Sequence, residues 1–262
     1  MSDDFSGNVV VERPSDFVAL IRFNRLDKKN ALHSSMIVEL GRVLSRFQDD
    51  DAIRCVVLTG TEDFFAAGAD IKEMVSFGPL DVANAPARVA AWAAIERFKK
   101  PIIAAVNGVA FGAGCELALL SDFIIAGDNA QFGQPEVRLG SMPGDGGTQR
   151  LPRKLSPNLA AYLTITGEAI GAEQAARLGL VVEVVSPAET VDRAVAIASV
   201  VSSRPPLAVQ AIKSCINAAV GANDHNGLAF ERDAVNRLAM TADAKEGMKA
   251  FAEKRPPNFT GQ

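Results

Sequence analysis

Apolar residues recur with two different periods along the chain, and their alternation predicts an α/β fold. Short continuous apolar runs are typical of strands buried on both faces, and they lie at residues 18–23, 53–59, 102–106, 123–126 and 180–185. Apolar positions three to four residues apart predict a helix over 89–98 and an amphipathic helix through Met36, Leu40, Val43, Leu44 and Phe47. Strands that alternate with helices favour a largely parallel sheet.

Strand-like runs stop near Ala188, and helical spacing continues to the end of the chain. The predicted helices cover residues 190–202, 207–220, 228–240 and 244–253. Two prolines at 205–206 interrupt this pattern, because proline cannot continue a helix. We therefore predict a core of residues 1–203 that carries the functional site, and a C-terminal helical module of residues 204–262.

One further segment, residues 76–88, breaks the periodicity. It contains Gly78-Pro79 and Pro86 among small residues, a composition typical of a loop. Two interpretations are open: a mobile loop that shapes a ligand pocket, or a passive connection.

Composition narrows the class of protein. The chain has 262 residues, 48% of them hydrophobic and 22% charged, with a net charge of −4. That balance is ordinary for a globular protein and disfavours a nucleic-acid-binding role. No run reaches the roughly 20 apolar residues of a membrane span, and the start, Met1 to Phe5, is acidic. We expect a cytoplasmic protein with no membrane association.

Metal and thiol chemistry are also disfavoured by the residue counts. The three cysteines, Cys55, Cys115 and Cys215, are far apart within apolar segments and are interpreted as reduced core thiols. Only two histidines are present, which makes a histidine-based triad or metal site hard to build. Metal-free carboxylate chemistry is the simplest remaining hypothesis.

Two acids lie in glycine-rich or proline-interrupted turns that follow predicted strands. Glu116 ends the segment Gly108–Glu116, just inside the start of a predicted helix whose free amides can stabilise an oxyanion. Glu136 lies in Gln131–Val137, and the similar turn Phe64–Ile71 follows the strand at 53–59. This pattern predicts a site at the ends of several strands. The alternative is structural: a packing turn, with Glu116 stabilised by the helix dipole.

The chain resembles the crotonase (enoyl-CoA hydratase/isomerase) superfamily, and it looks closest to bacterial enoyl-CoA hydratases. The similarity is carried by Ala67-Gly68-Ala69-Asp70-Ile71, Ala104-Ala105-Val106-Asn107-Gly108 and Phe132-Gly133-Gln134-Pro135-Glu136. It implies a spiral of repeated ββα units, followed by a helical module that mediates contacts in a homotrimer or a dimer of trimers. It also implies reversible syn hydration of trans-2-enoyl-CoA in fatty-acid or related acyl-CoA degradation. The alternatives are an enoyl-CoA delta isomerase and a non-catalytic acyl-CoA- or RNA-binding relative; the presence of both acids favours hydration.

The resemblance also implies roles for individual positions. Glu116 would hold and activate water, Glu136 would deliver the proton to the α-carbon, and the backbone N–H groups of Ala69 and Ala113 would form the oxyanion hole. Coenzyme A would be part of the substrate, with no separate cofactor and no metal. The implied substrate and coenzyme A contacts are Ala67, Gly68, Asp70, Ile71, Lys28 and Lys29, with Phe251 and Lys254 supplied by a neighbouring subunit.

The turn at Gly144-Asp145-Gly146 departs from the family pattern, in which a small residue usually stands between the glycines. One interpretation is that Asp145 caps the helix expected near Thr148, because aspartate is a favourable N-cap residue. The other is that Gly144 and Asp145 modulate the site. In that case Asp145 is a third acid that alters substrate choice or isomerase activity.

Overall fold

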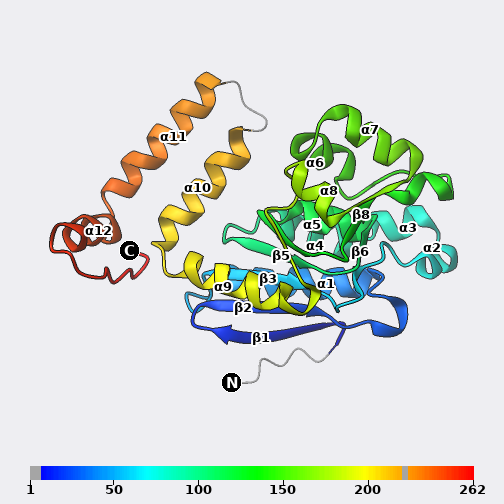
Figure 1. Ribbon diagram of the computed structural model, residues 1–262, viewed down its shortest axis with the longest axis horizontal. Coiled ribbons are helices and arrows are strands. Elements are labelled where there is room, and N and C mark those ends of the chain that lie inside the picture. Colours follow the sequence, from blue (N-terminus) through cyan, green and yellow to red (C-terminus); the bar gives the residue numbers. More distant parts are fainter. Residues whose placement is uncertain (1–6, 220–223) are drawn as a thin grey trace.

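The computed structural model contains two β-sheets with helices packed around them (Figure 1). It describes residues 7–219 and 224–262; the acidic N-terminal segment and Val220 lie outside this part of the chain. The six-stranded sheet has the order β1 (Val9–Ser15), β2 (Val18–Phe23), β3 (Cys55–Thr59), β5 (Ile102–Val106), β7 (Phe123–Gly127) and β10 (Glu183–Val185). The four-stranded sheet has the order β4 (Phe64–Ala66), β6 (Val109–Phe111), β8 (Gln131–Gly133) and β9 (Ala169–Gly171).

Successive strand pairs each add one strand to each sheet. In the pairs β3–β4, β5–β6 and β7–β8, the first strand joins the six-stranded sheet and the second joins the four-stranded sheet. Within each sheet these strands run parallel to those of the preceding pair. The ββα spiral implied by the family resemblance is therefore confirmed, with an antiparallel β1–β2 hairpin at its start.

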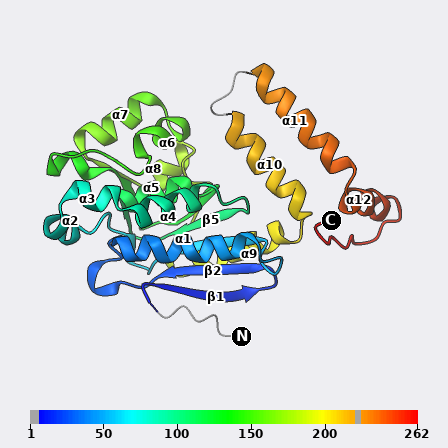
Figure 2. The same ribbon diagram turned by 180° about the vertical axis from the view of Figure 1, so that it is seen from behind.

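Both faces of the six-stranded sheet are buried, which explains the continuous apolar runs in its strands. One face, which includes Val56 and Leu58, belongs to the main core with helix α1 (Ser34–Gln48). Cys55 and Val57 point to the opposite face and pack with Ala194 and Ala198 of helix α9 (Thr190–Ser202). Figure 1 shows α9 in front of the sheet, and Figure 2, the opposite view, shows α1 in front of it.

Most of the remaining helices pack around the two sheets. They are η1 (Leu26–Lys28), α2 (Ile71–Phe77), α3 (Pro79–Asn84), α4 (Pro86–Glu96), α5 (Ala113–Leu120), η2 (Pro135–Leu139), α6 (Gly147–Lys154), α7 (Pro157–Thr166), α8 (Ala172–Arg177) and η3 (Pro187–Glu189).

Helices α10 (Pro206–Ala219), α11 (Asp224–Ala239) and α12 (Ala242–Ala252) stand apart from the body that contains the sheets (Figures 1 and 2). Lys213 of α10 reaches that body, where its Nζ lies 2.9 Å from Asp122 Oδ2. The four helices expected after Ala188 are confirmed, with ends that differ by a few residues. The division into two domains at residues 203/204 stays a prediction.

The expected loop at residues 76–88 is wrong, because that segment is mostly helical. Pro79 and Pro86 are the first residues of α3 and α4, a position where the missing N–H of proline costs no hydrogen bond. The prolines therefore begin helices here instead of interrupting structure. The strand expected at 180–185 is also shorter than predicted, since β10 begins at Glu183.

Candidate active site

Three parallel strands of the four-stranded sheet end at the same edge and carry the candidate site residues there. Strand β4 leads into Ala67-Gly68-Ala69, β6 into Gly112-Ala113, and β8 into Gln134-Pro135-Glu136. Because β4, β6 and β8 are hydrogen-bonded neighbours in that order, these segments come together. The structure thus places the oxyanion-hole candidates next to the second candidate acid.

The two predicted oxyanion amides lie on backbone segments in close approach. An ideal Cβ on Gly112 would lie 3.7 Å from the Cα of Gly68. Ala113 is the first residue of α5, so its N–H has no acceptor within the helix. Within the described ranges, the N–H groups of Ala69 and Ala113 have no hydrogen-bond acceptor. Both are available to a ligand oxygen, and the Ala113 methyl leaves its donor intact.

Glu116 lies in the first turn of α5 with its side chain in the protein interior. The residue is 1% exposed, and its Oε1 accepts hydrogen bonds from the amides of Asp145 (2.8 Å) and Gly147 (2.7 Å). Among the described residues, no group donates to Oε2. Burial raises the pKa of Glu116 to about 7; the charges of Asp145 and Glu136 add to this effect, and the two amides oppose it.

Glu136 approaches the same place from η2. Its Oε1 would lie 2.8 Å from an ideal Cβ on Gly112, so the carboxylate contacts the Gly112–Ala113 segment. The buried Gln134 amide, in the orientation that satisfies its hydrogen bonds, donates to Glu136 Oε1 at 3.1 Å and Oε2 at 3.3 Å. Burial raises the pKa of Glu136, and the charge of Asp145 raises it further. The site therefore holds two carboxyl groups that are protonated more readily than usual.

A family model described as "Enoyl-CoA hydratase/isomerase" matches residues 13–262 of the sequence. The chain belongs to this family. It is 44% identical over 245 residues to the 2,3-dehydroadipyl-CoA hydratase of Escherichia coli (strain K12), a match that covers 94% of this chain and 96% of the relative. It is 41% identical over 254 residues to the crotonyl-CoA hydratase of Syntrophomonas wolfei, covering 96% and 97%.

Solved structures agree with this assignment. The structure superposes on an enoyl-CoA hydratase subunit from Geobacillus kaustophilus with a TM-score of 0.92 and 40% identity, covering 98% of this chain and 99% of the other. The enoyl-CoA hydratase from Bacillus anthracis gives a TM-score of 0.93 at 36% identity, with 98% and 100% covered. The chain thus has the fold of enoyl-CoA hydratases, as the family resemblance implied.

In this member of the enoyl-CoA hydratase/isomerase family, Asp70 has a structural role. Its side chain caps α2 by accepting from the amides of Lys72 (3.0 Å) and Glu73 (3.3 Å). It also pairs with Arg25, whose Nη2 lies 2.8 Å from Oδ2. Burial would raise the pKa of Asp70, but these hydrogen bonds hold it below its ordinary value. Next to it, Ile71 is 46% exposed.

The lysines expected to contact coenzyme A lie beside the oxyanion segment. The carbonyl of Lys29 accepts from the amide of Ala67 at 3.1 Å, which ties this turn to the start of the Ala67–Ala69 segment. Lys28 is exposed and pairs with Asp27 at 3.2 Å. This negative partner weakens the electrostatic attraction of Lys28 for a phosphate. The position of the two lysines is compatible with the predicted contact, which stays a prediction.

Asp145 does not cap the helix that follows it, so that interpretation is wrong. Helix α6 begins at Gly147, its N-cap is Gly146, and no side chain caps it. The Asp145 carboxylate instead forms an ion pair with Arg88 of α4, and its amide donates to Glu116. Gly144 has open space around its α-carbon. Asp145 is therefore a third acid beside the candidate site.

Two residues of this region were not predicted from the sequence. Gln134 belongs to the Phe132–Glu136 motif, and its place two residues before Glu136 is the signal that could have found it. Arg88 stands alone among apolar residues in a segment expected to be a loop. A buried partner for it could not be inferred without the fold, since Asp145 is 57 positions away.

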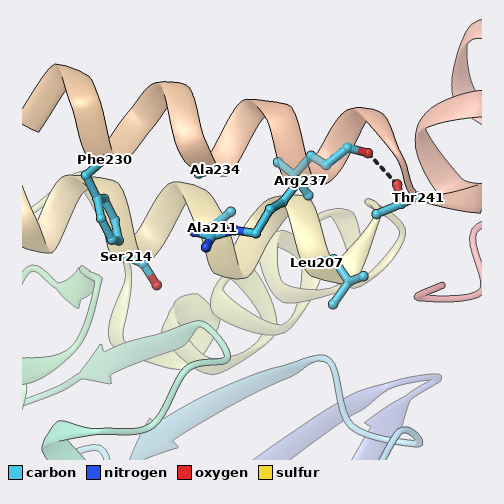
Figure 3. Close-up of a pocket in the computed structure, with 8 residues that line it drawn as sticks. Leu207, Ala211, Ser214, Phe230, Ala234, Arg237 and Thr241 are labelled. Atoms are coloured by element: carbon cyan, nitrogen blue, oxygen red, sulfur yellow. Dashed lines mark hydrogen bonds between the residues drawn. The ribbon is translucent and has the colours of Figure 1, made fainter.

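Phe251 and Lys254 are not brought to the site within one chain. Phe251 is 87% exposed at the end of α12, in the part of the molecule that stands apart from the sheets (Figure 1). A cavity of about 260 Å³ lies between α10 and α11 (Figure 3). Its lining is mainly apolar and contains no acid: Leu207, Ala211, Ser214, Phe230, Ala234, Arg237, Leu238 and Thr241. It therefore does not share the chemistry of the carboxylate site.

Within residues 7–219 and 224–262, no group of three or more His, Cys, Asp or Glu side chains could hold a metal ion. Over the same ranges, no single helix is long and apolar enough to cross a membrane. One helix pair, Pro187–Ser202 with Pro206–Ala219, reaches the required length and composition only jointly, across a 110° bend. Cys55 and Cys115 are buried free thiols and Cys215 is half-buried; burial raises the pKa of Cys55 to about 12.

Gly112→Ala is expected to lower both stability and activity. Gly112 has φ 51° and ψ −127°, a conformation that costs a residue with a Cβ about 1–3 kcal/mol. The added methyl would also press on Glu136 Oε1. Thermal melting and enoyl-CoA hydration should both decline relative to the wild type. As a control, Gly227→Ala on α11, where a Cβ meets no atom within 4 Å, should leave activity unchanged; equal activity of the two variants would contradict the prediction.

Proposed function

We propose that this chain is an enoyl-CoA hydratase that adds water reversibly, with syn stereochemistry, to trans-2-enoyl-CoA and forms 3-hydroxyacyl-CoA. The observation that carries the proposal is the convergence of two carboxyl groups, the buried Glu116 and the half-buried Glu136, with the unpaired amides of Ala69 and Ala113. Coenzyme A is part of the substrate in this proposal, and the reaction takes no metal or redox cofactor. The natural role would lie in fatty-acid or related acyl-CoA degradation.

In the proposed reaction, the thioester oxygen accepts hydrogen bonds from the Ala69 and Ala113 amides. These donors stabilise the negative charge that develops on this oxygen as water attacks C3. Glu116 is held through Oε1, which leaves Oε2 free to take the proton of the attacking water. Glu136, in its protonated form, delivers a proton to C2. The sum is the addition of one H₂O across the double bond.

The raised pKa values of both acids are compatible with proton transfer near neutral pH. One carboxyl must begin ionised and the other protonated, and burial together with mutual repulsion makes double ionisation unfavourable. Burial raises the pKa of Glu116 to about 7, which places its titration near neutral pH, where a general base is most effective. Burial and the charge of Asp145 raise the pKa of Glu136 above its ordinary value, so its carboxyl takes up a proton more readily than an exposed glutamate.

An assay of crotonyl-CoA hydration, in which the loss of the enoyl-thioester absorbance is measured, tests the proposal. We expect turnover, and its absence in the folded protein would favour a non-catalytic relative. The isomerase alternative needs one base and no water, so it predicts conversion of a 3-enoyl-CoA without hydration. A panel of chain lengths should include 2,3-dehydroadipyl-CoA, because one relative is named as its hydratase.

The proposed assembly is a homotrimer or a dimer of trimers in the cytoplasm. Large apolar side chains lie exposed on the three C-terminal helices and directly after α11: Ile212, Ile216, Leu228, Phe230, Val235, Met240, Met248 and Phe251. Exposed apolar surface of this kind supports subunit contacts. In such an assembly Phe251 and Lys254 of one subunit would reach the coenzyme A site of another. Light scattering that gives a monomer mass would reject this arrangement.

A further inference from the structure

The turn of residues 143–147 controls the orientation of Glu116. Both amides that hold Glu116 Oε1, those of Asp145 and Gly147, belong to this turn. A movement of the turn would therefore rotate or release the carboxylate. Catalytic groups tolerate little displacement, and a shift of about 1 Å can cost about 100-fold in rate.

Helix α4 fastens this turn through two ion pairs of opposite polarity. Arg88 pairs with the Asp145 carboxylate, and the two side chains are 9% and 13% exposed. At the C-terminal end of α4, Glu96 pairs with Arg150 of α6 at 2.6 Å. Arg150 also donates to the carbonyl of Asp145 at 2.6 Å. The turn is thus held by its side chain and by its backbone.

Helix α4 is itself a fixed support. It packs on α1 so closely that an ideal Cβ on Gly41 would lie 2.8 Å from Ala91, and Trp92 and Ile95 belong to the main core. Arg88 extends from the first turn of this helix beside Trp92, with its Cζ 5.8 Å from the ring centroid. The guanidinium therefore has a defined place that does not depend on the turn.

We propose that Arg88 and Asp145 form a positioning pair for Glu116, in which Arg88 fixes the turn that holds the carboxylate and neutralises the third acid beside it. The proposal rests on the function proposed above. Neither residue needs to contact substrate. The guanidinium of Arg88 balances the negative charge of the Asp145 carboxylate beside the two acids. The backbone amide of Asp145 orients Glu116.

The electrostatic surroundings support this role. After burial, the charge of Asp145 is among the causes that raise the pKa of both Glu116 and Glu136. Strands β4, β6 and β7, which also pack near α5, carry no titratable side chain. Lys154 of α6 contacts the opposite end of α5, at the Ser121 carbonyl. The ionisable groups around Glu116 are Cys115, Glu136, Asp145, Arg88, Glu96 and Arg150.

The two partners predict opposite effects on the pH profile of kcat. Asp145→Asn removes a negative charge and leaves Arg88 unbalanced, so the acid limb should move about one unit to lower pH. Arg88→Gln leaves Asp145 unbalanced, so the same limb should move about one unit to higher pH. Each variant should lower kcat about 10- to 100-fold while KM changes less than about twofold.

The double variant Arg88→Gln/Asp145→Asn should bring the limb back to its wild-type position. The control is Glu183→Gln, which breaks the exposed Glu183–Arg193 pair and should change neither kcat nor the profile. Thermal melting identifies variants that fail to fold; if Arg88→Gln is one of them, Arg88→Lys should retain the wild-type profile, and Asp145→Asn carries the test.

Unchanged kcat and profile in Asp145→Asn, or shifts in the same direction for both single variants, would overturn the positioning pair. Wild-type activity in the same assay separates this result from a failure of the proposed function. An inactive wild type rejects both proposals, whereas an active wild type with unaffected variants rejects the positioning pair alone.

Discussion

Replacing Glu116 or Glu136 with glutamine is expected to lower kcat for crotonyl-CoA hydration by about 10²- to 10⁴-fold, the usual range for a general acid or base. The amide keeps the shape of the carboxyl group, and the oxygen of Gln at 116 can still accept the Asp145 and Gly147 amides. What is lost is the ability to take or give a proton. Steady-state kinetics should therefore show a fall in kcat with a small change in KM.

The matched control for these variants is Glu168→Gln, whose side chain is 55% exposed and pairs with Arg138 at 2.9 Å. It changes the same chemical group outside the site and should retain wild-type turnover. Near-normal kcat in folded Glu116→Gln or Glu136→Gln would contradict the roles assigned to the two acids.

The same Glu116→Gln variant is expected to be more stable than the wild type above pH 7, by up to about 3 kcal/mol. Burial raises the pKa of Glu116 from its ordinary value of 4.5 to about 7 in the folded protein. Between these pH values the folded protein binds more protons than the unfolded chain, so wild-type stability falls as pH rises. Glutamine carries no charge and avoids this loss.

Urea denaturation at pH 4 and pH 8 measures this effect. The stability difference between variant and wild type should be small at pH 4, where the carboxyl is protonated in both states, and large at pH 8. Exposed Glu62 provides a control, because Glu62→Gln makes the same chemical change on the protein surface. A Glu116→Gln variant that is equally destabilised at both pH values would disprove the expectation.

The sequence predicted the architecture where apolar periods are long enough to be recognised. Helix α1 is one example, because its buried positions recur over several turns, and strand β5 is another, because all five of its residues are apolar and buried. The second sheet was not predicted from periodicity, since β4, β6, β8 and β9 have three residues each. A three-residue strand is too short to establish alternation, and only the family resemblance implied these units.

The candidate site was predicted in part, for a comparable reason. Glu116 and Glu136 lie in turns with local signals, namely glycine density and a proline next to an acid. The partner of Asp145 has no local signal. Aspartate before a helix is usually a cap, yet here Gly146 takes the cap position and Arg88, from a distant helix, takes the carboxylate. The role of the Asp145 side chain is therefore set by a tertiary contact and not by the local preference of aspartate for the start of a helix.

The parallel order of β4, β6 and β8 has a consequence for the evolution of this site. Hydrogen-bonded strands lie about 4.8 Å apart, so the ladder between β4 and β6 sets the separation of the two segments that supply the Ala69 and Ala113 amides. Those donors belong to the main chain and survive side-chain replacement. The acids at this site, Glu116, Glu136 and Asp145, are side chains of neighbouring segments and can be replaced one at a time by single substitutions. If the proposed mechanism holds, substitutions at these three acids would change how protons are delivered to the bound thioester while the main-chain donors stay in place.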